Sequence, residues 1–148
     1  MVAERHKQGR NEATTFLIVD AQSVKNTDTA MEKGYDAGKK VSGIKRHIAV
    51  DTQGLPHALA VTAADVTDRK GCLLALEREQ DNLDAVQKVL ADGGYIGKAF
   101  ASSVQALIGA EVGIVKRNEL HRFAVLPKRW VRAQFFLIGK EQVALEKL

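Results

Sequence analysis

Runs of β-branched and apolar residues, separated by polar and turn-forming residues, predict five strands in this chain. They lie at residues 16–24, in two runs within residues 44–65, at 86–92 and at 111–117. The two middle runs are joined by the sequence TQGLP, a composition typical of the turn in an antiparallel hairpin. Side chains of the first middle run alternate between two faces, so Arg46 lies on one face and Lys45 and His47 on the other.

Two segments have the apolar spacing of amphipathic helices. The first covers residues 68–83, with Thr67 or Asp68 as its N-cap, and the second covers residues 97–110. The apolar stripe of the first helix consists of Leu73, Leu74 and Leu76. Residues 25–43 are polar and rich in glycine, and we expect them to form a surface loop. This order of elements predicts an α/β fold, a mixed five-stranded sheet flanked by helices.

The size of the chain limits the choice of architecture. With 148 residues, 45% of them hydrophobic, it is long enough for one domain with a core and too short for two. No run of about 18 apolar residues occurs, and the N-terminus lacks the apolar segment of a secretion signal, so we expect a cytoplasmic protein. The single Cys72 cannot form an intramolecular disulfide, and we expect it to be a small buried side chain.

Positive charge is concentrated near the C-terminus. The net charge is only +4, but residues 116–132 contain six basic side chains and a single acidic one, Glu119. Such a segment could face a polyanion, and a solvated basic surface explains the same composition equally well.

Asp20 and Asp92 each stand at the end of an apolar strand, where a carboxylate is costly to bury unless it is paired, hydrogen-bonded or bound to a cation. Two such groups on neighbouring strands would repel each other, and Mg²⁺, which often binds only one or two carboxylates, would hold them together. The alternative is that each aspartate caps a turn or the next helix. A phosphate-binding loop is excluded, because GGYIGKA (93–99) has too few residues between the glycines and no hydroxyl after Lys98.

Four sequence segments carry a resemblance to a known family. They are IVDAQSVKNT, GKKVSGIKRHIAVDTQGLPHALAVTAADVTDRKG, VLADGGYIGKAF and KRNELHRFAVLPKRWV. Together they resemble the catalytic domain of bacterial insertion-sequence DDE transposases, which belong to the ribonuclease-H-like superfamily. The resemblance implies metal-dependent cleavage and transfer of DNA strands, in which three carboxylates (Asp, Asp and Glu) bind two divalent ions, Mg²⁺ or Mn²⁺.

The resemblance places the first two catalytic metal ligands at Asp20, in IVDAQS, and at Asp92, in LADGGY, on strands that are adjacent in such a sheet. In the family motif, an Arg is followed by three intervening residues and then by the Glu that is the third carboxylate. Six further residues separate this Glu from a Lys. Here Arg129 matches the Arg and Lys140 the Lys, but Ala133 occupies the position of the Glu. The resemblance therefore implies an impaired site that lacks its third carboxylate.

The tail of the chain departs from the family in a way that suggests a frameshift. The codons GAG CGC AGT for Glu-Arg-Ser, read one base out of register after a C, spell Arg-Ala-Gln, the residues found at 132–134. We therefore hypothesise an insertion-sequence remnant: residues 1–17 are left from the N-terminal region, 18–131 form an incomplete catalytic domain and 132–148 are an out-of-frame tail. Absence of Glu-Arg-Ser coding from the shifted register of the gene would refute this hypothesis.

Basic residues around the two aspartates are candidates for contacts with DNA, because lysine and arginine neutralise backbone phosphates. They are Lys25, Lys45, Arg46, Lys116, Arg117 and Arg129. His47 belongs to the same group, but a hydrogen-bonded structural histidine is the better interpretation of this residue alone.

Three functions from different classes remain open at this point. The first is a transposase catalytic domain, acting on insertion-sequence ends and target DNA, with impaired strand cleavage. The second is a DNA-binding module without catalysis, which could occupy DNA ends or associate with an intact transposase. The third is a fragment without function.

Overall fold

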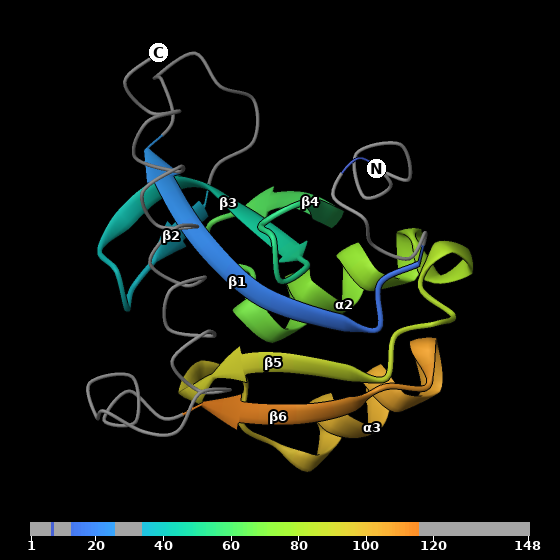
Figure 1. Ribbon diagram of the computed structural model, residues 1–148. Coiled ribbons are helices and arrows are strands. Elements are labelled where there is room, and N and C mark those ends of the chain that lie inside the picture. Colours follow the sequence, from blue (N-terminus) through green and yellow to red (C-terminus); the bar gives the residue numbers. More distant parts are fainter. Residues whose placement is uncertain (1–6, 8–12, 26–33, 116–148) are drawn as a thin grey trace, which may run out of the picture.

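The computed structural model describes residues 7, 13–25 and 34–115, and within them one mixed sheet packs against two helices (Figure 1). The strands are β1 (Phe16–Lys25), β2 (Gly34–Asp36), β3 (Val41–Val50), β4 (Pro56–Ala63), β5 (Lys88–Asp92) and β6 (Glu111–Val115). The helices are α2 (Asp68–Arg78) and α3 (Lys98–Ile108), accompanied by the 3-10 turns η1 (Gln80–Asn82) and η2 (Gly93–Tyr95).

The sheet combines an antiparallel half with a parallel half. Its strand order is β2-β3-β1-β5-β6, and β4 also pairs with β3. Strand β3 is antiparallel to β1, β2 and β4, whereas β1 and β5 are parallel to each other, as are β5 and β6. The carboxyl ends of β1, β5 and β6 consequently lie at the same edge of the sheet.

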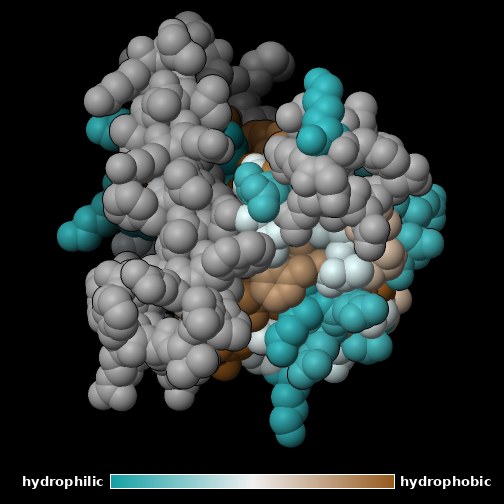
Figure 2. Space-filling model, viewed as in Figure 1, coloured by the Kyte–Doolittle hydropathy of each residue, from teal (hydrophilic) through white to brown (hydrophobic). Residues whose placement is uncertain are grey.

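The two helices cover one face of the sheet, and the alternation of side chains along β1 separates two clusters. Leu17 and Val19 are buried in the larger cluster, which includes Leu76 of α2 and Val104 of α3. Ile18, which points to the opposite face, is buried in a smaller cluster with Val50, packed against Phe16, Ile48 and Leu90. Apolar surface remains visible over β1 and β5 in the space-filling view (Figure 2).

Local sequence signals account for the ends of both helices. The Thr67 side chain accepts a hydrogen bond of 3.2 Å from the backbone N–H of Lys70, which caps α2. Helix α3 ends at Gly109, whose φ of 69° is a left-handed conformation that glycine adopts without strain. The start of α2 and the end of α3 thus fall at residues whose chemistry favours a helix terminus.

The structure confirms the α/β class, the hairpin, both helices and all five expected strands. The expected loop over residues 25–43 was wrong in part, since it contains β2 and the start of β3, so the sheet has six strands. Strand β2 is too short to show an alternation of apolar and polar residues, and it forms by pairing with β3. The stripe of α2 also differs: Gly71, Cys72, Ala75 and Leu76 are buried, while Leu73 and Leu74 are only partly buried.

Among the described residues, none of the helices has both the length and the apolar character needed to cross a membrane.

Candidate active site

Strand register brings Asp20 and Asp92 to the same level of the sheet. In the parallel pairing of β1 with β5, Ile18 is opposite Leu90, and two further residues along each strand lead to Asp20 and Asp92. Because side chains alternate, both aspartates lie on the face of the sheet that Ile18 and Leu90 share. Neighbouring strands are about 4.8 Å apart, and the charge of Asp92 acts to raise the pKa of Asp20, so the two carboxylates lie near each other.

Each carboxylate uses one oxygen for a local hydrogen bond. Asp20 Oδ1 accepts from the backbone N–H of Ala21 at 2.8 Å, and Asp92 Oδ1 accepts from that of Gly94 at 2.9 Å. The second bond caps the turn η2, as the turn-capping interpretation of Asp92 expected. Capping and metal binding are nonetheless compatible, since no hydrogen bond or ion pair within the described part of the chain engages Oδ2 of either aspartate.

Burial makes the ionised form of Asp20 unfavourable in the metal-free protein. Desolvation is the main cause that raises the pKa of Asp20 to about 6. The charges of Asp92 and Asp68 act in the same direction, whereas the hydrogen bond from Ala21 and the charge of Lys39 oppose the shift. Two carboxylates at this spacing suit Mg²⁺, which completes its coordination with water and substrate oxygens. Within the described ranges no group of three potential metal ligands occurs.

We predict that Asp20→Asn stabilises the metal-free protein at high pH. A folded pKa of about 6, against an ordinary value of 3.8, means that ionised Asp20 destabilises the fold as pH rises from about 4 through 6. In EDTA at pH 8, the free energy of unfolding should therefore increase by about 2 kcal/mol in urea titrations. At pH 4 wild type and variant should be equally stable, and a gain of the same size at both pH values would contradict this assignment.

Lys45, expected among the DNA contacts, lies instead in a buried network on the helix-covered face. Only 6% of its side chain is exposed, and Nζ lies 3.3 Å from Asp36 Oδ2 and 3.0 Å from Asp68 Oδ1. Nζ also donates a hydrogen bond of 2.8 Å to the carbonyl of Val66. Burial acts to lower the pKa of Lys45, but the hydrogen bonds and charges of Asp68 and Asp36 outweigh it and raise the pKa. Its ammonium is thus not available to a ligand at the surface.

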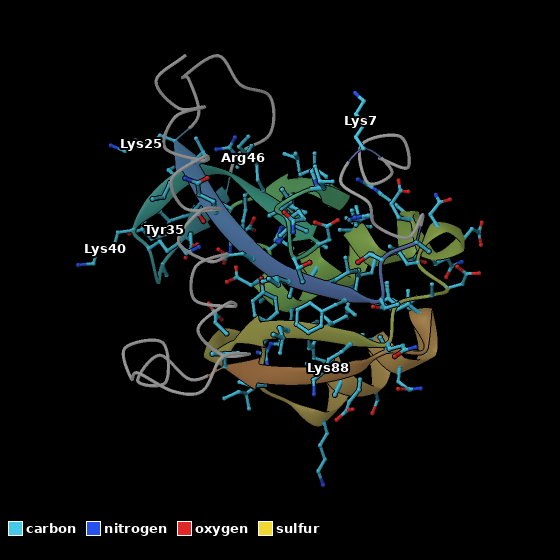
Figure 3. The ribbon with its side chains drawn as sticks, viewed as in Figure 1. Lys7, Lys25, Tyr35, Lys40, Arg46 and Lys88 are labelled. Atoms are coloured by element: carbon cyan, nitrogen blue, oxygen red, sulfur yellow. The ribbon has the colours of Figure 1, made fainter. Side chains whose placement is uncertain are left out.

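The other expected DNA contacts have different surroundings. Lys25 is exposed at the end of β1 (Figure 3). Arg46 is partly buried, and its Nη2 donates to Gln22 Oε1 at 3.0 Å. Lys116, Arg117, Arg129 and Ala133 lie outside the described residues.

His47 has the structural role expected from the sequence. Its Nε2 lies 2.8 Å from the hydroxyl of Thr62, which itself donates to the carbonyl of Ala63, so Nε2 carries the proton in this bond. The ring is fully buried, and desolvation lowers its pKa to about 4. His47 is therefore a neutral core residue at physiological pH, packed directly against Gly71 of α2.

Lys39 is a residue of the site that the sequence did not indicate. It lies in the turn between β2 and β3, and its Nζ donates a hydrogen bond of 3.0 Å to the carbonyl of Ala21, next to Asp20. The segment was expected to be an irregular loop, and nothing in a polar, Gly-rich sequence shows which lysine returns to a strand. Only the pairing of β2 with β3 places this turn beside β1.

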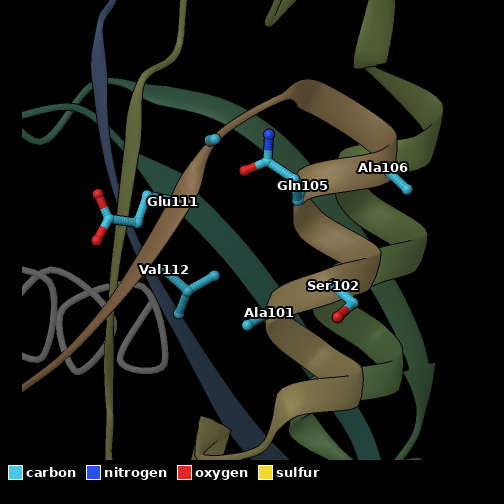
Figure 4. Close-up of a pocket in the computed structure, with 7 residues that line it drawn as sticks. Ala101, Ser102, Gln105, Ala106, Glu111 and Val112 are labelled. Carbon is cyan, nitrogen blue, oxygen red and sulfur yellow. The ribbon is translucent and has the colours of Figure 1, made fainter.

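A shallow groove of about 460 Å³ lies between α3 and the beginning of β6 (Figure 4). It is lined by Ala101, Ser102, Gln105, Ala106, Ala110, Glu111 and Val112. Since Glu111 is opposite Lys88 at the start of β5, the groove lies at the end of the strands away from Asp92. It is thus separate from the pair of aspartates.

A mixed sheet that presents two aspartates from adjacent parallel strands is the arrangement implied by the resemblance to DDE transposases. Residues 11–131 match the family described as Transposase DDE domain, and the chain belongs to this family. Members of this family generally depend on a divalent metal.

A chain of the cryo-EM structure of the simian T-cell lymphotropic virus intasome in complex with PP2A regulatory subunit B56 gamma is similar to this chain, with 14% sequence identity and a TM-score of 0.47. The similarity covers 70% of this chain and 32% of that chain. No curated protein matches the sequence.

Proposed function

We propose that the chain is the catalytic domain of a bacterial insertion-sequence transposase that carries two of the three metal-binding carboxylates and is impaired in DNA strand cleavage. The observation that carries this proposal is the strand register, which aligns Asp20 with Asp92 on one face of the sheet. Membership of the DDE family supports the reaction class and the DNA partner. A reaction on bacterial chromosomal DNA would take place in the cytoplasm.

In this proposal the carboxylates of Asp20 and Asp92 would hold the divalent ion. A bound Mg²⁺ or Mn²⁺ would activate the attacking oxygen and stabilise the leaving oxygen of a phosphodiester. Asp20 must first lose its proton, because only the carboxylate is a ligand, and the approach of a cation favours that loss. The hydrogen bonds from Ala21 and Gly94 fix the orientation of the two carboxylates and leave one oxygen of each for the cation.

Impairment follows from the sequence position of the third carboxylate, where the chain has Ala133. A site with two carboxylates binds its cations more weakly and orients the attacking oxygen less well than a site with three. DNA binding without catalysis is the second candidate function. It is favoured by the same sequence position, because the side chain of Ala133 cannot bind a metal ion.

We predict that Mn²⁺ binds to the unmodified chain and that Asp92→Ala weakens this binding at least about tenfold, since one of two charged ligands is lost. Isothermal titration calorimetry with Mn²⁺ alone measures this, with Asp84→Ala as the control, because Asp84 is an exposed aspartate before β5. Equal Mn²⁺ affinities of all three proteins would contradict the metal site.

A nicking assay on supercoiled DNA that carries the element's own ends tests the impairment. We expect the unmodified chain and Asp92→Ala to be equally inactive in Mg²⁺ or Mn²⁺, and Ala133→Glu alone to restore nothing if the whole tail is out of frame. Metal-dependent nicking by the unmodified chain that disappears in Asp92→Ala would show that two carboxylates suffice.

A further inference from the structure

Lys39 lies near Asp20, and among the described residues it forms no ion pair with that carboxylate. Its Nζ donates one hydrogen bond, of 3.0 Å, to the carbonyl of Ala21, the residue that follows Asp20. An ammonium group has three N–H donors, and the described residues engage one of them. Within the described part of the chain, Lys39 forms no ion pair with a carboxylate, although its charge acts on Asp20.

The turn that carries Lys39 is fastened to the sheet at several points. Asp36 Oδ1 accepts a hydrogen bond of 3.1 Å from the backbone N–H of Lys39, and Asp36 Oδ2 accepts one of 2.6 Å from the hydroxyl of Ser23 in β1. Asp36 Oδ2 also lies 3.3 Å from Nζ of buried Lys45 in β3. The side chain of Lys39 thus starts from a fixed backbone position and ends at a fixed carbonyl, which lowers the entropy cost of holding its charge in place.

The ammonium of Lys39 is held at a fixed position, unlike that of an ordinary surface lysine, and this bears on what it can bind. If its role were to neutralise Asp20, its ammonium would bind the carboxylate, whereas here it binds a neutral backbone carbonyl. Its remaining donors can therefore meet an anion that approaches Asp20 from solvent. Lysine binds phosphate as a compact point charge with several donors, so a phosphodiester is the anion that suits both groups.

We propose that Lys39 is a positioning residue that binds a non-bridging phosphate oxygen of DNA and so holds the phosphodiester at Asp20 and Asp92. The inference rests on the proposed function, since it takes DNA as the ligand of this edge of the sheet. It adds a phosphate subsite built from the turn between β2 and β3. The neighbouring Lys40 is exposed and its side chain points away from the sheet, so it lies outside this subsite (Figure 3).

The experiment measures the affinity of the full chain for a short fluorescent DNA duplex by anisotropy, in EDTA and over a series of salt concentrations. Loss of one phosphate contact in Lys39→Met should weaken binding about fivefold and reduce the slope of log K against log salt by about one. Lys40→Met is the matched control and should change affinity by less than about twofold. Lys39→Arg should retain the slope, because it keeps the charge.

Each outcome has a defined meaning. Equal losses in Lys39→Met and Lys40→Met, or a loss in Lys39→Arg as large as in Lys39→Met, would overturn the subsite. Unchanged binding of Lys39→Met, with a thermal unfolding curve like that of the unmodified chain, would overturn it as well. If the unmodified chain does not bind the duplex even at low salt, the proposed DNA partner fails together with the subsite. Failure of Mn²⁺ binding with intact DNA binding would instead affect only the proposed catalytic function.

Discussion

Replacing Lys45 by methionine is expected to lower the free energy of unfolding by about 3 kcal/mol. The substitution keeps most of the side-chain volume but removes the ammonium that lies between Asp36 and Asp68. Removing one partner of a buried ion pair leaves the other charges without compensation, and the exposed fraction of the Asp68 side chain, 29%, keeps the cost at the lower end of the usual range. Urea unfolding followed by circular dichroism measures the loss.

Lys70→Met is the matched control for this prediction, because Lys70 is an exposed lysine of α2. It should change the free energy of unfolding by less than about 0.5 kcal/mol. If Lys45→Met is as stable as Lys70→Met but loses DNA affinity, Lys45 acts at the surface, as the sequence alone suggested. A second variant, Lys45→Met with Asp36→Asn, should recover part of the lost stability, since it removes one of the uncompensated charges.

Replacing Gly71 by alanine is expected to destabilise the fold by about 3 kcal/mol, although alanine favours helices. A Cβ at this position would lie 2.0 Å from Cε1 and Nε2 of His47. The ring cannot move away freely, because it is fully buried and its Nε2 is bonded to Thr62. Relief therefore requires a shift of α2 away from β3, which opens the core. Thermal and urea unfolding of the variant measure the effect.

The control for the glycine prediction is Gly93→Ala. Among the described residues, a Cβ there would meet Ile96 Cδ1 alone, at 4.0 Å, an ordinary contact. It should stay within about 1 kcal/mol of the unmodified chain. The cost of Gly71→Ala should largely disappear in a His47→Ala background, because the side chain that opposes the new methyl group is then absent. If Gly71→Ala has the same cost with and without His47, the close packing of ring and helix is not the cause.

Most of the fold could be predicted from local patterns. Apolar runs, the TQGLP turn, the Thr67 cap and Gly109 each define an element or its end within a few residues of sequence. The incorrect predictions have a common cause, because each concerns residues whose structure depends on contacts with another element of the chain. Strand β2 exists because Gly34–Asp36 pair with β3. The inner face of α2 includes Gly71, packed on His47, and Leu76, whereas Leu73 and Leu74 are only partly buried.

The residues of the candidate site also include some that the sequence indicated and others that it did not. Asp20 and Asp92 could be found in the sequence, because a carboxylate that ends an apolar strand is conspicuous and the surrounding motifs resemble a known family. The roles of the lysines could not be found. Lys45 and Lys39 are both charged residues near one strand, yet the first is buried between two carboxylates and the second reaches the edge of the site.

The sequence by itself therefore determined the class of fold, the two aspartates and the family to which the chain belongs, because each rests on residues that are close together in the chain. Only the tertiary structure decided that Asp20 and Asp92 lie at one level, which depends on the register between β1 and β5. It also decided that Lys45 is buried between two carboxylates and that Lys39 donates a hydrogen bond to the carbonyl of Ala21. These properties depend on contacts between segments distant in sequence, and the energy of such contacts is set by burial and distance rather than by residue type alone.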